Sequence, residues 1–345
     1  MNEKNKNVSN AHLLQWAAAG IGVFLAASAV YKHLNRYRLT NKVVLITGGS
    51  RGLGLEIARQ LVKEGAKLAI CARTERQLEM ARRELAGMGG EVLAIPADLT
   101  SPNAVKAMVK EVIQHYGRID VLINNAGVIQ VGPQEAMKIR DYEDAMDANF
   151  WAPLYCMHAI IPGFIKQGEG RIVNITSIGG KVAVPHLLPY TASKFALVGL
   201  SEGMHAELKK DNIHVTTVVP NLMRTGSPRN VDVKGDHERE YAWFKISDSS
   251  PLLSQRVEVA ASSIIRAIEF GEAEAILSVS GKVATLLHGV APAWVSGVLA
   301  LVNKLLPGMS SEGNMSRKGH QVESKRSRGP VAKLTDRAAI RNNEL

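Results

Sequence analysis

The chain reads VVLITGGSRGLG from Val43 to Gly54, and this stretch decides the expected fold. A short apolar run leads into a turn that contains Gly48 and Gly52, and helical periodicity begins directly after it. Glycine lets the backbone turn tightly and approach a pyrophosphate, which the N-terminus of the next helix then binds. The spacing is G-x-x-x-G-x-G rather than the common G-x-G-x-x-G. The stretch therefore predicts a nucleotide-binding loop that opens an alternating strand-helix domain.

Short apolar runs alternate with helical stretches over residues 39–280. Seven runs are expected to be strands, at 43–46, 67–70, 92–95, 119–123, 171–175, 215–219 and 275–279. Helical periodicity separates them, for example at 52–64, 75–86 and 102–116. Continuous apolar strands are typical of a parallel sheet that is covered on both faces. We predict an α/β fold, a single Rossmann-like doubly wound parallel sheet of seven strands with helices on both faces.

The end of the second strand distinguishes between the nicotinamide cofactors. An acidic residue there would bind the ribose 2′-hydroxyl of NAD, whereas an arginine can accommodate the 2′-phosphate of NADP. The chain has Cys71-Ala-Arg73 at this point, with no acid before Glu75, and Arg51 lies inside the glycine turn. Two guanidinium groups can hold a phosphate. NADP(H) is therefore favoured over NAD(H), the alternative being that both arginines are ordinary exposed loop residues.

Tyr190 and Lys194 lie one helical turn apart in the string Pro189-Tyr-Thr-Ala-Ser-Lys194. A phenol titrates near pH ~10, so an unperturbed tyrosine exchanges protons poorly at neutral pH. A lysine four residues later on the same helical face places a positive charge beside the phenol and favours phenolate. We expect this tyrosine to pass a proton to or from an alcohol or ketone. A solvated helix face would produce the same spacing.

Together these motifs resemble the short-chain dehydrogenase/reductase family over roughly Leu39 to Val279. Ser177 precedes Tyr190 by thirteen residues, which is the usual interval in that family. The matching motifs follow the family's order: Thr47-Gly-x-x-x-Gly-x-Gly54, Ala97-Asp98-Leu99, Asn124-Asn-Ala-Gly127, Asn149, Ser177 and Tyr190-x-x-x-Lys194. The resemblance implies an oxidoreductase that interconverts a hydroxyl and a carbonyl.

The same resemblance implies roles for individual residues. Tyr190 would be the catalytic acid/base, and Lys194 would lower its pKa and bind the nicotinamide ribose. Ser177 would hydrogen-bond the substrate oxygen. Asn149 would hold a water of the proton relay, unless it is a satisfied buried amide. No metal is needed, because the nicotinamide exchanges the hydride and the tyrosine the proton.

The expected cofactor site combines the glycine loop and the two arginines with residues that the resemblance adds. Asp98 would contact the adenine, although it could instead cap the following helix, and Thr225 would contact the carboxamide. The full set is Thr47, Gly48, Ser50, Arg51, Gly52, Leu53, Gly54, Arg73, Asp98, Leu99, Asn125, Ala126, Gly127, Tyr190, Lys194, Pro220 and Thr225. The family's Pro-Gly is replaced here by Pro220-Asn221, and asparagine tolerates a left-handed backbone.

Residues 226–255 correspond to the family's mobile substrate lid. This polar stretch contains Tyr241-Ala-Trp-Phe244. These aromatic residues favour an apolar substrate, for which steroid, retinoid, long-chain acyl and sphingoid ketones are all compatible. An ordinary surface helix that packs Trp243 and Phe244 on the body would explain them equally well.

An uncharged segment at 13–31 follows a polar N-terminus at 1–12 and is long enough to span a bilayer as a helix. A cleaved signal peptide is the competing interpretation. Basic residues follow the segment more densely than they precede it, so the catalytic domain is expected in the cytoplasm. This predicts a single-pass membrane protein that draws a hydrophobic substrate from the bilayer.

The C-terminal part extends beyond the expected domain. Residues 282–308 form an amphipathic helical extension that Pro292 should break or kink. Three readings stay open: an interfacial membrane helix, packing on the body or across a dimer, and a second membrane span. Residues 310–345 are expected to be a mostly disordered basic tail, with a short helix near 333–343.

Composition limits the remaining classes. The net charge is +10, but much of the basic excess lies near the two ends and no DNA-binding motif accompanies it, so nucleic acid is not an expected partner. The two cysteines, Cys71 and Cys156, lack metal-type spacing and disfavour a disulfide framework. A homodimer or homotetramer is common in the resembled family. The rival hypothesis is a nucleotide-sensing or scaffolding protein without turnover.

Overall fold

The computed structural model describes residue 16 and residues 36–250, 254–329 and 332–344. It divides the chain into two units, Met1–Arg38 and Leu39–Leu345. The predicted membrane segment at 13–31 lies, apart from Trp16, outside the described residues. In the part of the chain that the structure describes, no single helix has the length and apolar character to cross a membrane.

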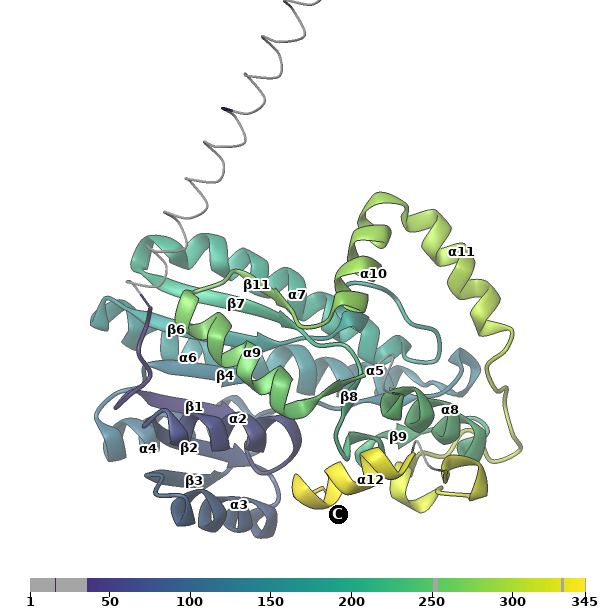
Figure 1. Ribbon diagram of the computed structural model, residues 1–345, viewed down its shortest axis with the longest axis horizontal. Helices are drawn as coiled ribbons and strands as arrows, with labels where there is room; N and C mark the ends of the chain where they lie inside the picture. The colour runs from purple at the N-terminus through teal and green to yellow at the C-terminus, as the bar shows by residue number, and fades with distance from the viewer. Residues whose placement is uncertain (1–15, 17–35, 251–253, 330–331, 345) are drawn as a thin grey trace, which may run out of the picture. The chain divides into compact units, whose positions relative to one another are not determined.

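A sheet of seven parallel strands forms the centre of the second unit (Figure 1), in the order β11-β7-β6-β4-β1-β2-β3. This confirms the predicted α/β fold. The strands are β1 Val43–Thr47, β2 Lys67–Ala72, β3 Val92–Pro96, β4 Val121–Asn124, β6 Gly170–Ile175, β7 Ile213–Val219 and β11 Glu274–Ile276. The strand β11 ends earlier than predicted because Ser278 caps the next helix, its hydroxyl accepting a hydrogen bond from the Gly281 N–H at 3.0 Å.

Helices cover both faces of the sheet. The connecting helices are α2 Gly52–Lys63, α3 Glu75–Gly87, α4 Pro102–Tyr116, α5 Ile139–Met146, α6 Ala152–Gln167, α7 Leu188–Leu208 and α9 Val257–Phe270. Helices α2, α3 and α9 pack together, and α4, α6 and the end of α7 share a separate core cluster with the sheet. All five residues of β1 are buried, as expected for a central parallel strand. Cys71 and Cys156 are buried free thiols in this core.

The strand order reverses between β1 and β4. The chain moves outward in one direction through β1, β2 and β3, and in the other through β4, β6 and β7. Ligands of open parallel sheets bind at such a switch point, outside the carboxyl ends of the strands. Thr47, Asn124 and Ile175 end three of the strands at this edge.

Residues 226–250 fold over this edge as η5 Ser227–Asn230, β9 Asp232–Val233 and α8 His237–Ser249. Strand β9 forms a small sheet with β5 Gln130–Val131 and β12 Arg317–Lys318. Tyr241 and Phe244 are buried in a cluster that includes Val131. The aromatic residues of α8 therefore pack against the body, which is the second of the two alternatives for this segment.

Helices α10 Val279–Val290 and α11 Pro292–Asn303 follow the sheet. Pro292 is the first residue of α11, and the two helices meet at a bend of 119°. The predicted break at Pro292 is confirmed.

The C-terminal segment folds onto the body instead of being disordered as expected. It forms η6 Gly319–Gln321, η7 Lys325–Ser327 and α12 Ala332–Arg341. The ammonium of Lys245, fully buried in α8, forms ion pairs with Glu323 and, at 2.8 Å, with Asp336. The low hydrophobicity of this segment predicts disorder. Charged side chains hold the segment on the body instead, and such contacts leave no apolar pattern in the sequence.

Candidate active site

The glycine loop between β1 and α2 needs its glycines for space and for backbone angle. Gly48 and Gly52 have φ of +65° and +57°. A Cβ on Gly54 would lie 2.3 Å from the Gly48 carbonyl oxygen, a distance that no side chain tolerates. The tight turn places the N-terminus of α2, whose first N–H groups suit an anion, at the carboxyl edge of the sheet.

Thr47 joins this loop to the loop after β4. The Thr47 hydroxyl oxygen accepts hydrogen bonds from the N–H groups of Asn125 at 2.9 Å and Ala126 at 3.1 Å. The Asn125 side-chain amide donates in return to the carbonyl oxygens of Thr47 at 3.0 Å and Gly48 at 3.1 Å. These reciprocal bonds hold two of the predicted cofactor-binding segments against each other.

Asn149 is fully buried in a π-helical turn, Asp147–Trp151. Its side-chain oxygen accepts from the Val128 N–H at 2.9 Å, and its amide donates to the Val128 carbonyl at 3.0 Å and to the Ser193 hydroxyl at 2.9 Å. A π-turn often marks a functional site. The residue is a satisfied buried amide, as the alternative expected, and these bonds fix its orientation.

Lys194 and Asn149 both face Gly127. A Cβ on Gly127 would lie 2.7 Å from the Asn149 side-chain oxygen and 3.5 Å from the Lys194 ammonium. That ammonium donates to the Ile175 carbonyl oxygen at 2.9 Å and lies 5.8 Å from the centre of the Tyr190 ring. The structure thus gathers four of the predicted site residues, Gly127, Asn149, Tyr190 and Lys194, near the end of β6.

Tyr190 forms a hydrogen bond with Ser177 that favours the phenolate, but burial outweighs it. Burial raises the pKa of Tyr190 to about 12, with Ser177 opposing the shift. Burial also lowers the pKa of Lys194 to about 8. The expected lowering of the tyrosine pKa by Lys194 is therefore not seen, because removing the phenol from water disfavours its charged form more strongly.

Arg51 and Arg73 act on each other across the rim of the site. The guanidinium of Arg51 donates to the Asn230 side-chain oxygen at 2.8 Å. Burial lowers the pKa of Arg51, the Glu344 carboxylate opposes this shift, and the charge of Arg73 adds to it. Two cationic side chains on the segments that follow β1 and β2 suit a polyanion.

Other predicted residues lie nearby in different settings. Ser50 and Leu53 are buried in and next to the loop, and Leu99 is buried after β3. Asp98 is exposed, and its carboxylate accepts hydrogen bonds from the N–H of Thr100 at 3.1 Å and from its hydroxyl at 2.9 Å. The helix that follows is capped by the Ser101 hydroxyl instead, which accepts from the Ala104 N–H.

The turn after β7 forms without a left-handed residue at Asn221. Its side chain donates to the Ser280 hydroxyl at 2.9 Å, and Asn221 is not among the residues with positive φ. The Pro220 carbonyl accepts from the Ile178 N–H at 2.7 Å. Thr225 is buried further along the same segment. The departure from Pro-Gly is therefore accommodated without strain.

A cleft of about 560 Å³ lies between α11 and the segment before α7. Val184, His186 and Leu188 line it on one side, and Leu299 and Leu306 on the other. The cleft opens beside the helix that carries Tyr190.

His186, at one wall of this cleft, was not singled out by the sequence. It has a positive φ of 63°, and its ring lies 2.8 Å from the Glu240 carboxylate. The same carboxylate accepts from the Trp243 indole at 2.7 Å. No local pattern marks this group, because its members come from the loop before α7 and from α8.

Comparisons with known proteins agree with this arrangement. A family model described as short chain dehydrogenase matches residues 42–234, more than half of the chain. The chain is 34% identical to the 11-beta-hydroxysteroid dehydrogenase-like 2 of Arabidopsis thaliana over 81% of this chain and 83% of that protein. It is 33% identical to the dehydrogenase/reductase SDR family member 7B of Mus musculus over 59% of this chain and 65% of that protein.

Solved structures of this kind are also similar. A short-chain dehydrogenase from Streptomyces avermitilis aligns with a TM-score of 0.66 and 26% identity, over 77% of this chain and 98% of that one. An actinorhodin polyketide ketoreductase solved with NADPH aligns with a TM-score of 0.60 and 31% identity, over 68% and 95% of the two chains.

Proposed function

Because this chain belongs to the short-chain dehydrogenase family, we propose that it is an NADP(H)-dependent oxidoreductase that interconverts a carbonyl and a hydroxyl on a hydrophobic substrate. One observation carries the proposal: Asn149 and Lys194 lie beside Gly127, Ser177 and Tyr190 lie beside Gly179, and the Lys194 ammonium joins the two pairs at 5.8 Å from the Tyr190 ring. A fold retained only for nucleotide sensing has no need to keep this set together.

Each side chain has a defined task in the proposal. The nicotinamide, when bound, exchanges a hydride with the substrate carbon. Ser177 and Tyr190 hydrogen-bond the substrate oxygen, and the Tyr190 phenol exchanges the proton there. Lys194, held by the Ile175 carbonyl, binds the ribose of the nucleotide. Asn149 keeps the adjoining backbone of Val128 in place.

The protonation state of Tyr190 favours carbonyl reduction. A phenol with a pKa of about 12 is protonated at neutral pH. It can donate a proton to the oxygen of a ketone as the hydride arrives, whereas alcohol oxidation requires it to lose its proton first so that it can accept the proton of the alcohol. We propose reduction by NADPH as the physiological direction.

NADP(H) is proposed as the cofactor on the strength of Arg51 and Arg73. The two side chains offer the 2′-phosphate two cationic partners, and no acidic side chain stands at the end of β2 to bind a free 2′-hydroxyl. The NADPH-bound ketoreductase supports this choice by similarity.

The proposed substrate is hydrophobic. The cleft at the start of α7 is lined in part by apolar residues, among them Val184, Leu188, Leu299 and Leu306, which fit such a molecule. The names of the relatives point the same way, since they include a hydroxysteroid dehydrogenase-like protein and a polyketide ketoreductase.

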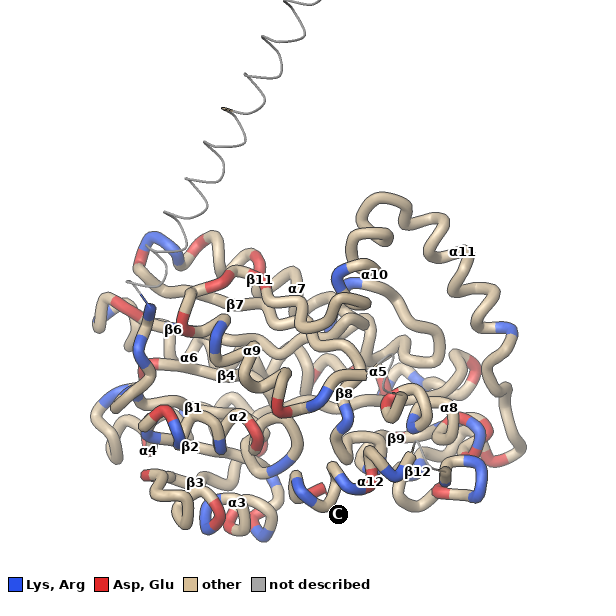
Figure 2. Tube along the Cα trace, viewed as in Figure 1, with Lys and Arg blue, Asp and Glu red and all other residues tan. Residues whose placement is uncertain are grey.

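We also propose that the α10–α11 hairpin lies at a membrane surface. Leu286, Val290, Trp294 and Leu301 are each more than three-fifths exposed, and no acidic residue occurs from Ile276 to Ser311. Figure 2 shows the hairpin as tan apart from basic positions, in contrast to the mixed charges over the sheet and its helices. Apolar side chains with basic flanks suit an anionic bilayer surface.

The uncharged segment at 13–31 would add a second membrane attachment, and the adjoining cleft would receive substrate from the bilayer. A screen of NADPH consumption against hydrophobic ketones, with NADH in parallel, tests the proposed activity. Turnover that depends on Tyr190 supports it, and cofactor binding without turnover of any carbonyl would favour the sensing hypothesis.

A further inference from the structure

The last residues of the chain lie on the glycine loop. The Gly52 N–H, at the start of α2, donates to the Asn342 carbonyl oxygen at 2.9 Å. The Asn343 side chain donates to the Ser50 carbonyl oxygen at 2.9 Å. The Glu344 carboxylate accepts from the Gly226 N–H, next to Thr225. Residues 342–344 thus touch two of the backbone segments that the proposed cofactor site uses.

Glu344 places a carboxylate where the site is built for an anion. The residue is only 5% exposed, and one of its carboxylate oxygens lies 3.1 Å from the position that a Cβ on Gly52 would take. The Arg51 guanidinium attracts it. Burial raises its pKa to about 7, and the Gly226 N–H and Arg51 oppose that shift. The carboxylate therefore occupies the neighbourhood of the α2 N-terminus and of an arginine assigned to phosphate.

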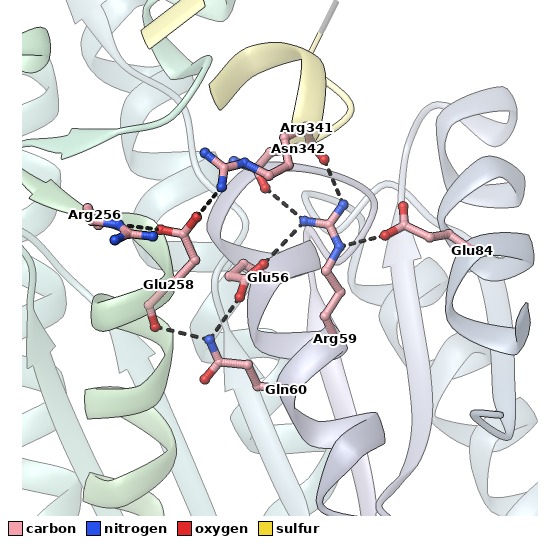
Figure 3. A network of polar contacts seen from close by, with 8 residues as sticks. All are labelled: Glu56, Arg59, Gln60, Glu84, Arg256, Glu258, Arg341 and Asn342. Carbon is pink, nitrogen blue, oxygen red and sulfur yellow. Dashed lines mark hydrogen bonds and ion pairs between the residues drawn. The ribbon is translucent and has the colours of Figure 1, made fainter. Parts of the chain in front are cut away.

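Arg59, on α2, binds both a backbone carbonyl and a side chain of the C-terminal segment (Figure 3). Its guanidinium donates to the Asn342 side-chain oxygen at 2.9 Å and to the Arg341 carbonyl at 2.7 Å. The Arg341 guanidinium in turn pairs with Glu258 of α9 at 2.6 Å. Asn342 is fully buried within this network. Such specific bonds indicate a docked segment rather than a tail in casual contact.

The preceding helix α12 is held independently of these contacts. Asp336 pairs with the buried Lys245 of α8, and the Thr335 hydroxyl bonds Ser249 of the same helix at 2.5 Å. Ala339 packs on Gly226, where a Cβ would come within 2.6 Å of it. The helix can therefore stay in place while residues 342–344 leave the glycine loop.

We propose that residues 342–344 are an internal competitor of the dinucleotide: the segment closes the glycine loop, and the cofactor must displace it to bind. This inference rests on the proposed NADP(H)-binding function. The Asn342 carbonyl accepts from the Gly52 N–H, which a pyrophosphate on this loop would need, and the Arg51 guanidinium attracts the Glu344 carboxylate. Two anions cannot share this position without repulsion. A segment that clamped bound cofactor would instead present donors to its phosphates.

Displacement has a measurable consequence. The apparent affinity of a ligand is its intrinsic affinity multiplied by the fraction of the protein that is open to it. Removing the competitor raises that fraction and therefore tightens binding. Coupling between competing sites in proteins is typically ~5- to 150-fold. A chain that ends after Arg341 should bind NADPH about tenfold more tightly than the full chain.

The test measures the dissociation constant of NADPH by fluorescence titration for the full chain, for the chain that ends after Arg341 and for Glu344→Gln. We expect the truncated chain to bind tightest and Glu344→Gln to lie between the two. Glu111→Gln, an exposed substitution on α4, is the matched control and should behave as the full chain does. In the full chain, NADPH should also speed hydrogen exchange in peptides that cover residues 338–344.

The outcomes separate the inference from the function on which it rests. The proposal that residues 342–344 compete with the cofactor would be overturned by equal or weaker NADPH binding after truncation. Slower exchange in residues 338–344 on adding NADPH would also overturn it, and would show that the segment clamps the cofactor. Absence of NADPH and NADH binding in every variant would overturn the proposed function together with the competitor. Tighter NADPH binding by the truncated chain and by Glu344→Gln, without a change in Glu111→Gln, supports competition by residues 342–344.

Discussion

The Lys194 ammonium lies 5.8 Å from the centre of the Tyr190 ring and donates to the Ile175 carbonyl oxygen at 2.9 Å. Lys194 is buried and Tyr190 is partly buried, and removal from water moves their pKa values in opposite directions, to about 12 for Tyr190 and about 8 for Lys194. At neutral pH the tyrosine therefore carries its proton, and the lysine loses its charge as the pH rises through about 8. This pairing makes the pH dependence of the reaction informative.

We expect carbonyl reduction to lose efficiency as the pH rises through about 8. The lowered pKa of Lys194 means that its ammonium form dominates below that pH and is lost above it, whereas Tyr190 keeps its proton throughout. A profile of kcat/KM from pH 6 to 10 measures this. In Lys194→Arg the residual activity should keep its plateau to higher pH, because arginine stays charged. An identical alkaline limb in both proteins would assign the titration to another group.

Arg73→Ala should weaken NADPH binding roughly tenfold, because one charge-assisted contact to the 2′-phosphate is lost. The affinity for NADH should not change. Arg73 is a cleaner test than Arg51, which also interacts with Glu344. The control is Arg76→Ala, an exposed arginine at the start of α3. Equal losses for NADPH and NADH would show that Arg73 does not select the cofactor.

Gly54→Ala should abolish dinucleotide binding. The added methyl group would lie 2.3 Å from the Gly48 carbonyl and 2.5 Å from the Asn125 amide, so the loop must shift. Gly203→Ala is the matched control on α7, where a Cβ meets nothing within 4 Å. It should retain binding and gain about 0.5–1 kcal/mol in the free energy of unfolding. Calorimetric titration with NADPH compares the two, and full affinity in Gly54→Ala would argue against this loop as the binding site.

Anionic vesicles should slow hydrogen exchange in peptides that cover residues 279–305. Leu286 and Leu301 are 66% and 62% exposed, so replacing both with glutamate leaves the core intact and opposes insertion. The double variant should lose the protection by vesicles. Ile139→Glu, at a position on α5 that is 75% exposed, should keep this protection. Protection that survives in the double variant would point to a second copy of the chain, or to another surface, as the partner.

The fold could be predicted from local patterns because the sheet is built from them. The apolar runs of the strands and the glycine loop at Gly48–Gly54 are each contained in a dozen residues or fewer, and their order specifies a doubly wound sheet. Thr47 and Asn125 are found by motif, and the structure adds the reciprocal bonds that explain why both are needed.

Long-range polar contacts escaped prediction. The contact between Gly52 and Asn342 spans most of the chain, and the segment that leads to it is too polar for periodicity to reveal a docking face. His186 and Glu240 likewise meet only in the folded protein. Helical spacing likewise shows the lysine near Tyr190 but not the burial that raises the pKa of the phenol.

The Tyr190→Phe variant tests the central claim most directly. The substitution removes the phenol hydroxyl and keeps the ring, so NADPH affinity and the melting temperature should stay close to those of the unaltered protein. General acid catalysis typically contributes ~10²- to 10⁴-fold. With a responsive hydrophobic ketone, NADPH consumption by Tyr190→Phe should therefore fall by at least about a hundredfold. Undiminished consumption in a folded, NADPH-binding variant would contradict the assignment of Tyr190 as the proton donor.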